Sequence, residues 1–128
     1  MKKLKIFFLL SLMMIGLGSC IYDWVAEEEV PPIDGGTEIS FSTQILPIFN
    51  SGNNCTSCHK PGRTSPDLTA ANAYSQINQS KYINTANPAE SLIYKVPSPN
   101  GTTHRHKTYT ASEAALILAW IQQGAKNN

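Results

Sequence analysis

The segment Cys55-Thr56-Ser57-Cys58-His59 is the most informative stretch of this 128-residue sequence. It places two thiols three positions apart and an imidazole directly after the second thiol. Residues at positions i, i+3 and i+4 share one face of a helical turn. We therefore expect both sulfur atoms and the imidazole to point to the same side of the chain, where a single ligand can engage all three.

This spacing is typical of covalent haem attachment. Two thiols on one turn reach the two vinyl groups at one edge of a porphyrin, while the imidazole turns toward the iron. A tetrahedral zinc site needs four ligands, and the sequence lacks a second cysteine pair. A thioredoxin-like redox pair belongs at a strand-to-helix junction, and we find no β-α-β pattern. We predict that Cys55 and Cys58 hold one haem c and that His59 is the proximal ligand of its iron.

The distal ligand of this iron has few candidates in the sequence. The only methionines are Met1, Met13 and Met14, which all lie in the N-terminal export segment described below. The C-terminal half offers His104 and His106 instead. We predict that one of these two binds the iron and favour His104, with His106 as the alternative. Ligation by two imidazoles predicts a lower reduction potential than ligation by His and Met, because a thioether favours the ferrous state.

The N-terminal segment has the features of a bacterial lipoprotein signal. Three lysines among the first five residues precede an apolar run over residues 6–17, which is too short to span a bilayer. Leu17-Gly18-Ser19-Cys20 resembles a lipobox. We predict a signal peptide over residues 1–19 and a lipid on Cys20 that anchors the protein to a membrane of the bacterial cell envelope, facing the periplasm or the cell exterior. An ordinary cleaved signal is the alternative.

Residues 20–38 are predicted to form the lipidated start of the mature chain and a flexible tether. Glu27-Glu28-Glu29 repel one another, Pro31-Pro32 stiffen the backbone and Gly35-Gly36 loosen it. The mature chain keeps seven basic and nine acidic residues, a net charge near −2, and has no basic run. We therefore expect no nucleic-acid partner. Residues 39–128 are predicted to form one domain.

This domain is predicted to be all-α, with long loops around the cofactor. A first helix is expected over Ser42 to Asn50, with Ser42 as its N-cap and Pro47 as a source of distortion. A short, weak helix is expected within residues 67–78, with an apolar face formed by Leu68, Ala71, Tyr74 and Ile77.

Two further helices are predicted toward the C-terminus. Asn87-Pro88 combines an N-cap with a proline at the first helical position and leads into about two turns over residues 89–94. The last helix begins with a capping box in which Thr110 and Glu113 satisfy each other's backbone donors. Gly124 is its expected stop. Its apolar stripe consists of Leu116, Ile117, Trp120 and Ile121.

Over residues 39–128 the sequence resembles the small class I-like mono-haem cytochrome c domains of bacterial lipoproteins. The haem motif is the specific element of this resemblance. The supporting elements are the segments 44–49, 66–68, 87–94 and 120–125. The resemblance implies a helical domain whose first and last helices cross beside the haem, with Leu92 and Tyr94 lying against it.

The resemblance also implies roles for single residues. The carbonyl of Pro66 would accept a hydrogen bond from the ring N–H of His59, which fixes the tautomer of a metal ligand. The expected haem pocket consists of Pro66, Leu68, Leu92, Tyr94 and Trp120. The chain departs from the family at the distal ligand, because the loop that usually carries a methionine holds His104 and His106 here.

These observations predict an electron carrier rather than an enzyme. The expected protein is a monomeric, membrane-anchored c-type cytochrome that exchanges one electron with a redox partner protein. The sequence displays no constellation of catalytic acid, base or nucleophile. Two alternatives remain open: a haem sensor or ligand-binding module with a free sixth coordination position, and a thiol-disulfide oxidoreductase lipoprotein without haem.

Overall fold

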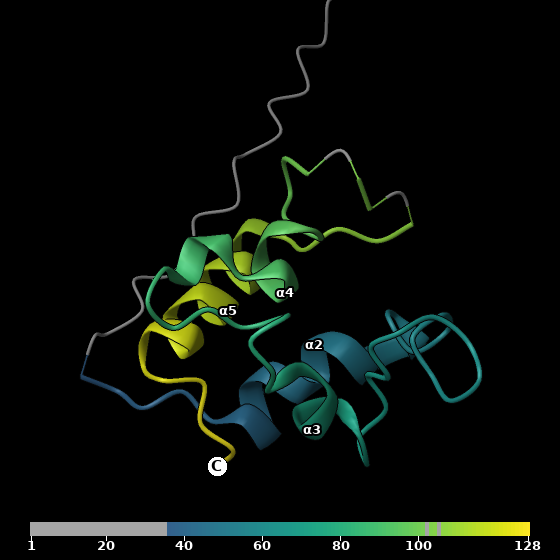
Figure 1. The fold of residues 1–128 in the computed structure, drawn as a ribbon, viewed down its shortest axis with the longest axis horizontal. Coiled ribbons are helices and arrows are strands. Elements are labelled where there is room, and N and C mark those ends of the chain that lie inside the picture. Colours follow the sequence, from purple (N-terminus) through teal and green to yellow (C-terminus); the bar gives the residue numbers. More distant parts are fainter. Residues whose placement is uncertain (1–35, 102, 105) are drawn as a thin grey trace, which may run out of the picture.

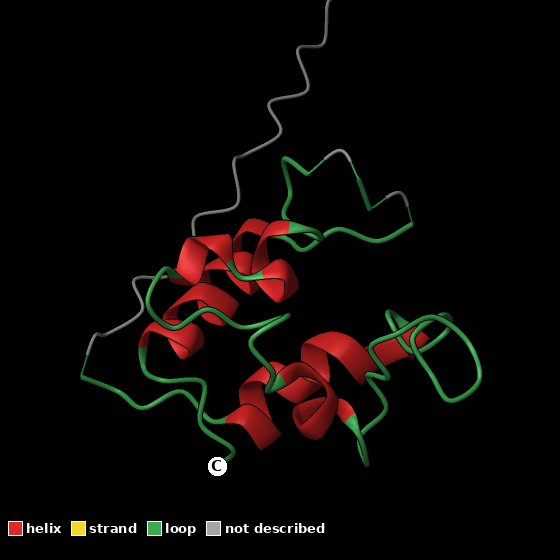
Figure 2. Cartoon of the chain, viewed as in Figure 1, coloured by secondary structure: helices red, strands yellow, loops and turns green. Residues whose placement is uncertain are grey.

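The computed structural model describes residues 36–101, 103, 104 and 106–128, and in this part the chain forms helices and loops without strands (Figures 1 and 2). The predicted helical class is therefore confirmed for these residues. The expected signal peptide, Cys20 and the tether as far as residue 35 lie outside them. Across the described ranges, no helix combines the length and the apolar character that crossing a membrane requires.

The first helical region starts earlier than predicted. It consists of a wide, π-type segment η1 (Phe41–Ile45) followed by α2 (Leu46–Asn50). Its N-cap is Ser40, whose hydroxyl accepts a hydrogen bond from the Thr43 N–H at 3.3 Å, so the prediction of Ser42 as the cap is wrong. The start is displaced because Phe41 is buried in the core, whereas Ser42 is exposed. The change from wide to α-helical winding comes just before Pro47, which has no N–H to donate.

The second helix is shorter than predicted. After a 3₁₀ turn, η2 (Ser51–Asn53), and a long loop, α3 covers only Ala73–Ile77. The segment before it is not helical because the Asp67 carboxylate accepts hydrogen bonds from the Thr69 N–H, the Thr69 hydroxyl and the Asn72 amide at 2.6–2.9 Å. Such local side-chain bonds compete with a helix. In the expected apolar face, Ala71 is exposed, and Ala73 is buried instead.

The predicted helix after Asn87 is divided in two. A 3₁₀ turn, η3 (Pro88–Glu90), is separated from α4 (Leu92–Lys95) by Ser91, which has an extended backbone (φ −60°, ψ 128°). The buried Ser91 hydroxyl accepts a hydrogen bond from the Asn84 N–H at 2.9 Å, and this bond holds Ser91 out of a continuous helix. Asn87 is the N-cap of η3 and Pro88 follows it at the start of the turn, as predicted, but the Asn87 side chain makes no capping bond.

The C-terminal helix α5 (Ala111–Gln122) confirms its prediction in detail. The Thr110 hydroxyl accepts from the Glu113 N–H at 3.1 Å, and the Glu113 carboxylate accepts from the Thr110 N–H at 2.8 Å. Gly124 follows with a positive φ of 96°, which glycine adopts without strain. Three of the four predicted apolar residues are buried, and Leu116 is partly buried.

The core lies where the two ends of the domain meet. The Phe41 ring contacts the rings of Tyr74 and Trp120, with centroid distances of 5.1 and 5.5 Å. Helix α5 packs against both η1 and α4, and Figure 1 shows α4 lying along α5, with α2 and α3 on the other side of the domain. This packing leaves the loops after η2 and after α4 to meet beside the core. These two loops carry the residues of the predicted site.

Candidate functional site

The Cys55–His59 segment forms one tight turn at the end of the first helical region. Gly52, with a φ of 64°, ends that region. The N–H of Cys58 and the N–H of His59 both donate to the Cys55 carbonyl, at 3.1 and 2.8 Å. The turn therefore brings positions i, i+3 and i+4 together, as the sequence predicts. Cys55 is partly buried and Cys58 is exposed, and both are free thiols.

The ring of His59 is held in one orientation by the chain that follows it. Its Nδ1 donates to the carbonyl oxygen of Pro66 at 3.0 Å, which is the contact expected from the sequence. The Leu68 N–H donates to the His59 carbonyl at 3.0 Å and closes the same loop. A carbonyl only accepts hydrogen bonds, so Nδ1 carries a proton, and in a neutral imidazole the lone pair is then on Nε2.

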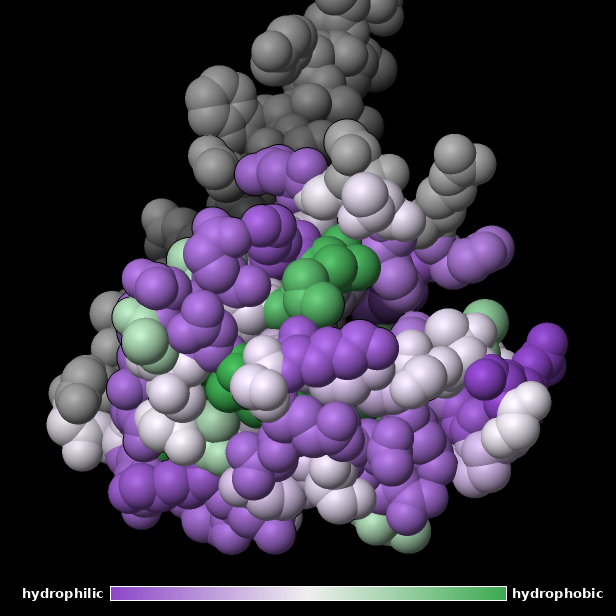
Figure 3. Space-filling model, in the orientation of Figure 1, coloured by the Kyte–Doolittle hydropathy of each residue, from purple (hydrophilic) through white to green (hydrophobic). Residues whose placement is uncertain are grey.

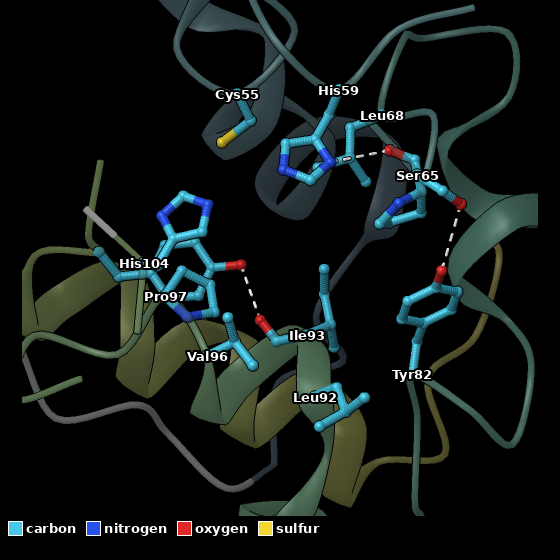
Figure 4. Close-up of a pocket in the computed structure, with 12 residues that line it drawn as sticks. Cys55, His59, Ser65, Leu68, Tyr82, Leu92, Ile93, Val96, Pro97 and His104 are labelled. Atoms are coloured by element: carbon cyan, nitrogen blue, oxygen red, sulfur yellow. Dashed lines mark hydrogen bonds between the residues drawn. The ribbon is translucent and has the colours of Figure 1, made fainter. Parts of the chain in front are cut away.

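His104 is held in the same manner on the opposite side. Its Nδ1 donates to the backbone carbonyl of Lys107, which again leaves the lone pair on Nε2. The rings of His59 and His104 are 6.0 Å apart between centroids, with their planes inclined by 22°. Figure 4 shows these two rings on either side of one cavity. The structure therefore brings together two imidazoles whose Nδ1 atoms are both bonded to backbone carbonyls.

A largely apolar cavity surrounds the pair. Its volume is about 160 Å³, smaller than the roughly 300–1,000 Å³ of ligand pockets. Leu92, Val96 and Pro97 line one side, and the exposed Leu92 lies on α4, where Figure 3 shows an apolar area next to a hollow in the molecular surface. The whole lining is Cys55, His59, Ser65, Pro66, Leu68, Tyr82, Leu92, Ile93, Val96, Pro97, His104 and Tyr109.

A second hollow adjoins the first and opens to the surface. It has a volume of about 420 Å³ and shares Cys55, His59 and His104 with the first cavity. Cys58 and His106 line only this outer hollow. Together, the linings of the two hollows include both thiols and the imidazoles of His59 and His104. His106 is exposed and lies farther toward the outside than His104.

Burial controls the ionisation of two groups in this space. It raises the pKa of the Cys55 thiol, an effect that the nearby Lys107 ammonium opposes. Burial also raises the pKa of Tyr109 well above its ordinary value. The Tyr109 hydroxyl donates to the Ile93 carbonyl at 2.8 Å, so it is neutral and satisfied. The cavity therefore contains polar groups in neutral form among apolar neighbours.

Two residues of the predicted haem pocket do not line either hollow. Trp120 is buried in the core, where its ring contacts Phe41 and its indole N–H donates to the Lys126 carbonyl at 2.9 Å. Tyr94 is partly buried against the core. Their positions follow from the packing of η1 against α5, which places the aromatic cluster beside the cavity and not in its wall. Pro66, Leu68 and Leu92 do line the cavity.

Sequence reasoning missed several lining residues, among them Tyr82, Tyr109 and Ser65. One of them carried a signal. Tyr109 directly precedes the N-cap Thr110, and Ala114 follows at the fourth helical position; both are buried. A large apolar residue before an N-cap commonly packs against this position of the helix. Ser65 and Tyr82 lie in loops without periodicity, and no sequence signal marks them.

Comparison with known proteins gives no independent assignment of this site. No protein-family model matches the chain, and no curated protein or solved structure matches it. Among the described residues, no group of three or more His, Cys, Asp and Glu side chains is arranged to hold a metal ion. The donor set therefore consists of two thiols on one turn and two imidazoles facing one cavity.

Proposed function

We propose that this chain is a c-type cytochrome that transfers single electrons through one covalently bound haem with two histidine ligands. The observation that carries the proposal is the pair His59 and His104, with Nδ1 of each ring bonded to a backbone carbonyl and the ring centroids 6.0 Å apart. Metal-binding histidines commonly have this second hydrogen bond, which fixes the tautomer and makes the free nitrogen a better ligand.

The separation of the two rings fits one metal ion between them. An imidazole nitrogen binds a transition metal at about 2 Å and lies about 1 Å from its ring centre, so a linear arrangement separates two centroids by about 6 Å. The observed separation of 6.0 Å agrees with this value. A porphyrin supplies the other four nitrogen ligands of its iron, so the protein needs to contribute only these two.

The thiols and the cavity fit the rest of the cofactor. Cys55 and Cys58 flank a single turn with His59, and the space beside them is lined mainly by apolar side chains. Thioether bonds from both sulfur atoms would tie one porphyrin edge to the turn. Leu68, Leu92 and Ile93 would cover the apolar faces of the ring and exclude water from it.

The haem would supply the redox chemistry, since its iron is stable in both the ferric and the ferrous state. The protein side chains would hold the iron in one coordination state during electron transfer. His59 and His104 would be the two protein ligands of the iron. The hydrogen bonds to Pro66 and Lys107 limit rotation of both rings and thereby keep the ligand geometry constant.

The location and partners of the protein belong to the same proposal. The lipobox-like Leu17-Gly18-Ser19-Cys20 supports removal of residues 1–19 and a lipid anchor on Cys20. The domain would then face the periplasm or the cell exterior, where a redox partner protein exchanges electrons with it. A monomeric carrier without a catalytic role of its own fits this arrangement.

Absorption spectra of the exported protein test the proposal. Oxidised and reduced spectra are recorded for the wild type, His104→Ala and His106→Ala. We expect a low-spin spectrum for the wild type and for His106→Ala, because both axial ligands remain. We expect a high-spin spectrum for His104→Ala, because one ligand is lost. Circular dichroism of the three proteins checks that the helices remain folded.

Three results would contradict the proposal in different ways. A mature protein whose mass contains no haem, with two titratable thiols, would favour the thiol-disulfide oxidoreductase. Rapid and complete binding of carbon monoxide by the reduced wild type would favour a sensor with a free sixth position. A high-spin spectrum for His106→Ala, with His104→Ala unchanged, would assign the distal ligand to His106.

A further inference from the structure

Two hydroxyl groups lie at one end of the cavity with an exposed ammonium beside them, and none of the three has a described carboxylate partner. The hydroxyl groups of Ser65 and Tyr82 are 3.3 Å apart, and both residues line the cavity. The Lys81 ammonium lies 5.0 Å from the centre of the Tyr82 ring. Within the described residues, the ion pairs are Lys95 with Glu90 and Lys126 with Glu38, so Lys81 takes part in neither.

This cluster has the chemistry of an anion site. In a pair of bonded hydroxyls one proton is used between them, and the other remains available to an outside acceptor. The hydrogen bond from Ser65, aided by Lys81, lowers the pKa of Tyr82. Hydroxyl donors beside an ammonium favour a carboxylate in its ionised form. No aspartate or glutamate lines the cavity that these donors border.

The cluster lies across the cavity from the haem-attaching thiol. Figure 4 shows Cys55 at one end of the cavity and the bonded pair Ser65 and Tyr82 at the other, beyond the ring of His59. In haem, the vinyl groups and the two propionate groups occupy opposite edges of the porphyrin. A ring tied to Cys55 and Cys58 by its vinyl edge therefore directs its carboxylates toward the far end of the cavity.

We propose that Ser65, Tyr82 and Lys81 form the binding site for a haem propionate carboxylate and thereby set the pH dependence of the reduction potential. This inference rests on the proposed haem. A carboxylate near the iron stabilises the ferric state more when it is ionised. The hydroxyl donors and the ammonium lower the pKa of this carboxylate, and the positive charge of Lys81 offsets its effect on the iron.

Other titratable groups around the cavity do not replace this cluster. Cys55 would be consumed by the thioether, and His59 and His104 would be bound to iron. The Tyr109 hydroxyl is bonded to the Ile93 carbonyl. The Lys107 ammonium and the exposed His106 imidazole lie with Cys55 and Cys58 in the outer hollow. At the end of the cavity that a propionate would reach, the available donors are therefore Ser65, Tyr82 and Lys81.

The test is the reduction potential of the haem-loaded protein as a function of pH, from about pH 5 to about pH 9. Tyr82→Phe, Ser65→Ala and Lys81→Met are compared with the wild type. Removal of a donor raises the pKa of the propionate, so the pH range in which the potential changes moves upward by about one unit. Lys81→Met also lowers the potential above that range, because the ionised carboxylate is no longer neutralised.

Two matched controls separate this effect from general damage. Tyr74→Phe removes a hydroxyl that donates to the Ala125 carbonyl outside the cavity, and Lys126→Met removes an ammonium paired with Glu38. Neither should move the pH profile. If the pH profiles of Tyr82→Phe and Lys81→Met coincide with that of the wild type, the inference is overturned. The proposed function still stands in that case, provided that these proteins contain low-spin haem. Loss of haem from the wild type would overturn both.

Discussion

The two sides of the cavity position their histidines by different means. His59 belongs to a turn closed by backbone bonds to the Cys55 carbonyl, and Pro66, seven residues on, fixes its ring. His104 lies in a loop after α4, and its ring is fixed by Lys107, three residues on. The position of His59 is therefore fixed by the end of a helical region. The position of His104 depends on the contacts that hold its loop against the rest of the domain.

The loop of His104 is held mainly by its far end. The Tyr109 N–H donates to the Pro97 carbonyl at 2.7 Å, and the Tyr109 hydroxyl donates to the Ile93 carbonyl at 2.8 Å. These bonds join residues that are far apart in sequence, so they form only when α4 and α5 are packed. The proximal side, around His59, is therefore a local structure, and the distal side, around His104, is a product of tertiary packing.

The largest expected effect concerns the proximal side. His59→Ala removes the proposed ligand that lies on the same turn as both thiols, so a haem would lose its main orientation during attachment. We expect the yield of haem-bearing protein to fall by at least about tenfold, since even outer contacts of metal ligands are worth about 10–100-fold in affinity. Haem staining of the denatured chain, relative to total protein, measures this yield.

His104→Ala serves as the matched change on the distal side. It should retain nearly the full amount of covalent haem, because both thiols and the proximal ligand remain on their turn. Equal haem loss in the two variants would show that attachment depends on both ligands alike and would remove the distinction between the two sides.

An intermediate effect is expected from Tyr109→Phe. The change leaves the buried Ile93 carbonyl without its donor, which costs about 1–3 kcal/mol of unfolding free energy. Because Tyr109 holds the end of the distal loop, the reduced variant should also bind carbon monoxide more than the wild type. Urea unfolding and carbon monoxide titration measure the two effects.

Tyr74→Phe is the control for this prediction. It removes a hydroxyl that donates to the Ala125 carbonyl at 3.1 Å, away from the distal loop. Its stability should fall because a hydrogen bond is lost, but its carbon monoxide binding should equal that of the wild type. Increased binding in both variants would mean that general loosening, and not the anchor at Tyr109, exposes the iron.

The smallest expected effect comes from the cap of α5. Thr110→Ala removes the hydroxyl that accepts from the Glu113 N–H and should lower the unfolding free energy by about 1 kcal/mol. Asn87→Ala changes a residue whose side chain makes no capping bond, and its effect should stay within about 0.5 kcal/mol. Thermal unfolding measures the stability of both variants. Equal losses of unfolding free energy would contradict the conclusion that Thr110, and not Asn87, caps its helix through a side-chain hydrogen bond.

Much of the local structure could be predicted because it depends on neighbouring residues. The capping box of Thr110 and Glu113, the stop at Gly124 and the turn at Cys55 each follow from side chains within a few positions of one another. Predictions failed where a local bond competed with a helix. Asp67 holds the segment before α3 in a turn, and Ser91 divides the helix after Pro88.

The sequence by itself determined the helical class, the turn that carries both thiols and His59, and the choice of His104 and His106 as the available imidazoles. Only the tertiary structure decided which of these two faces His59, that Trp120 belongs to the core, and that Ser65 and Tyr82 border the cavity. The physical reason is distance along the chain. The spacing of residues within one turn fixes the direction in which their side chains point. Contacts between remote loops depend instead on how α4, α5 and η1 pack.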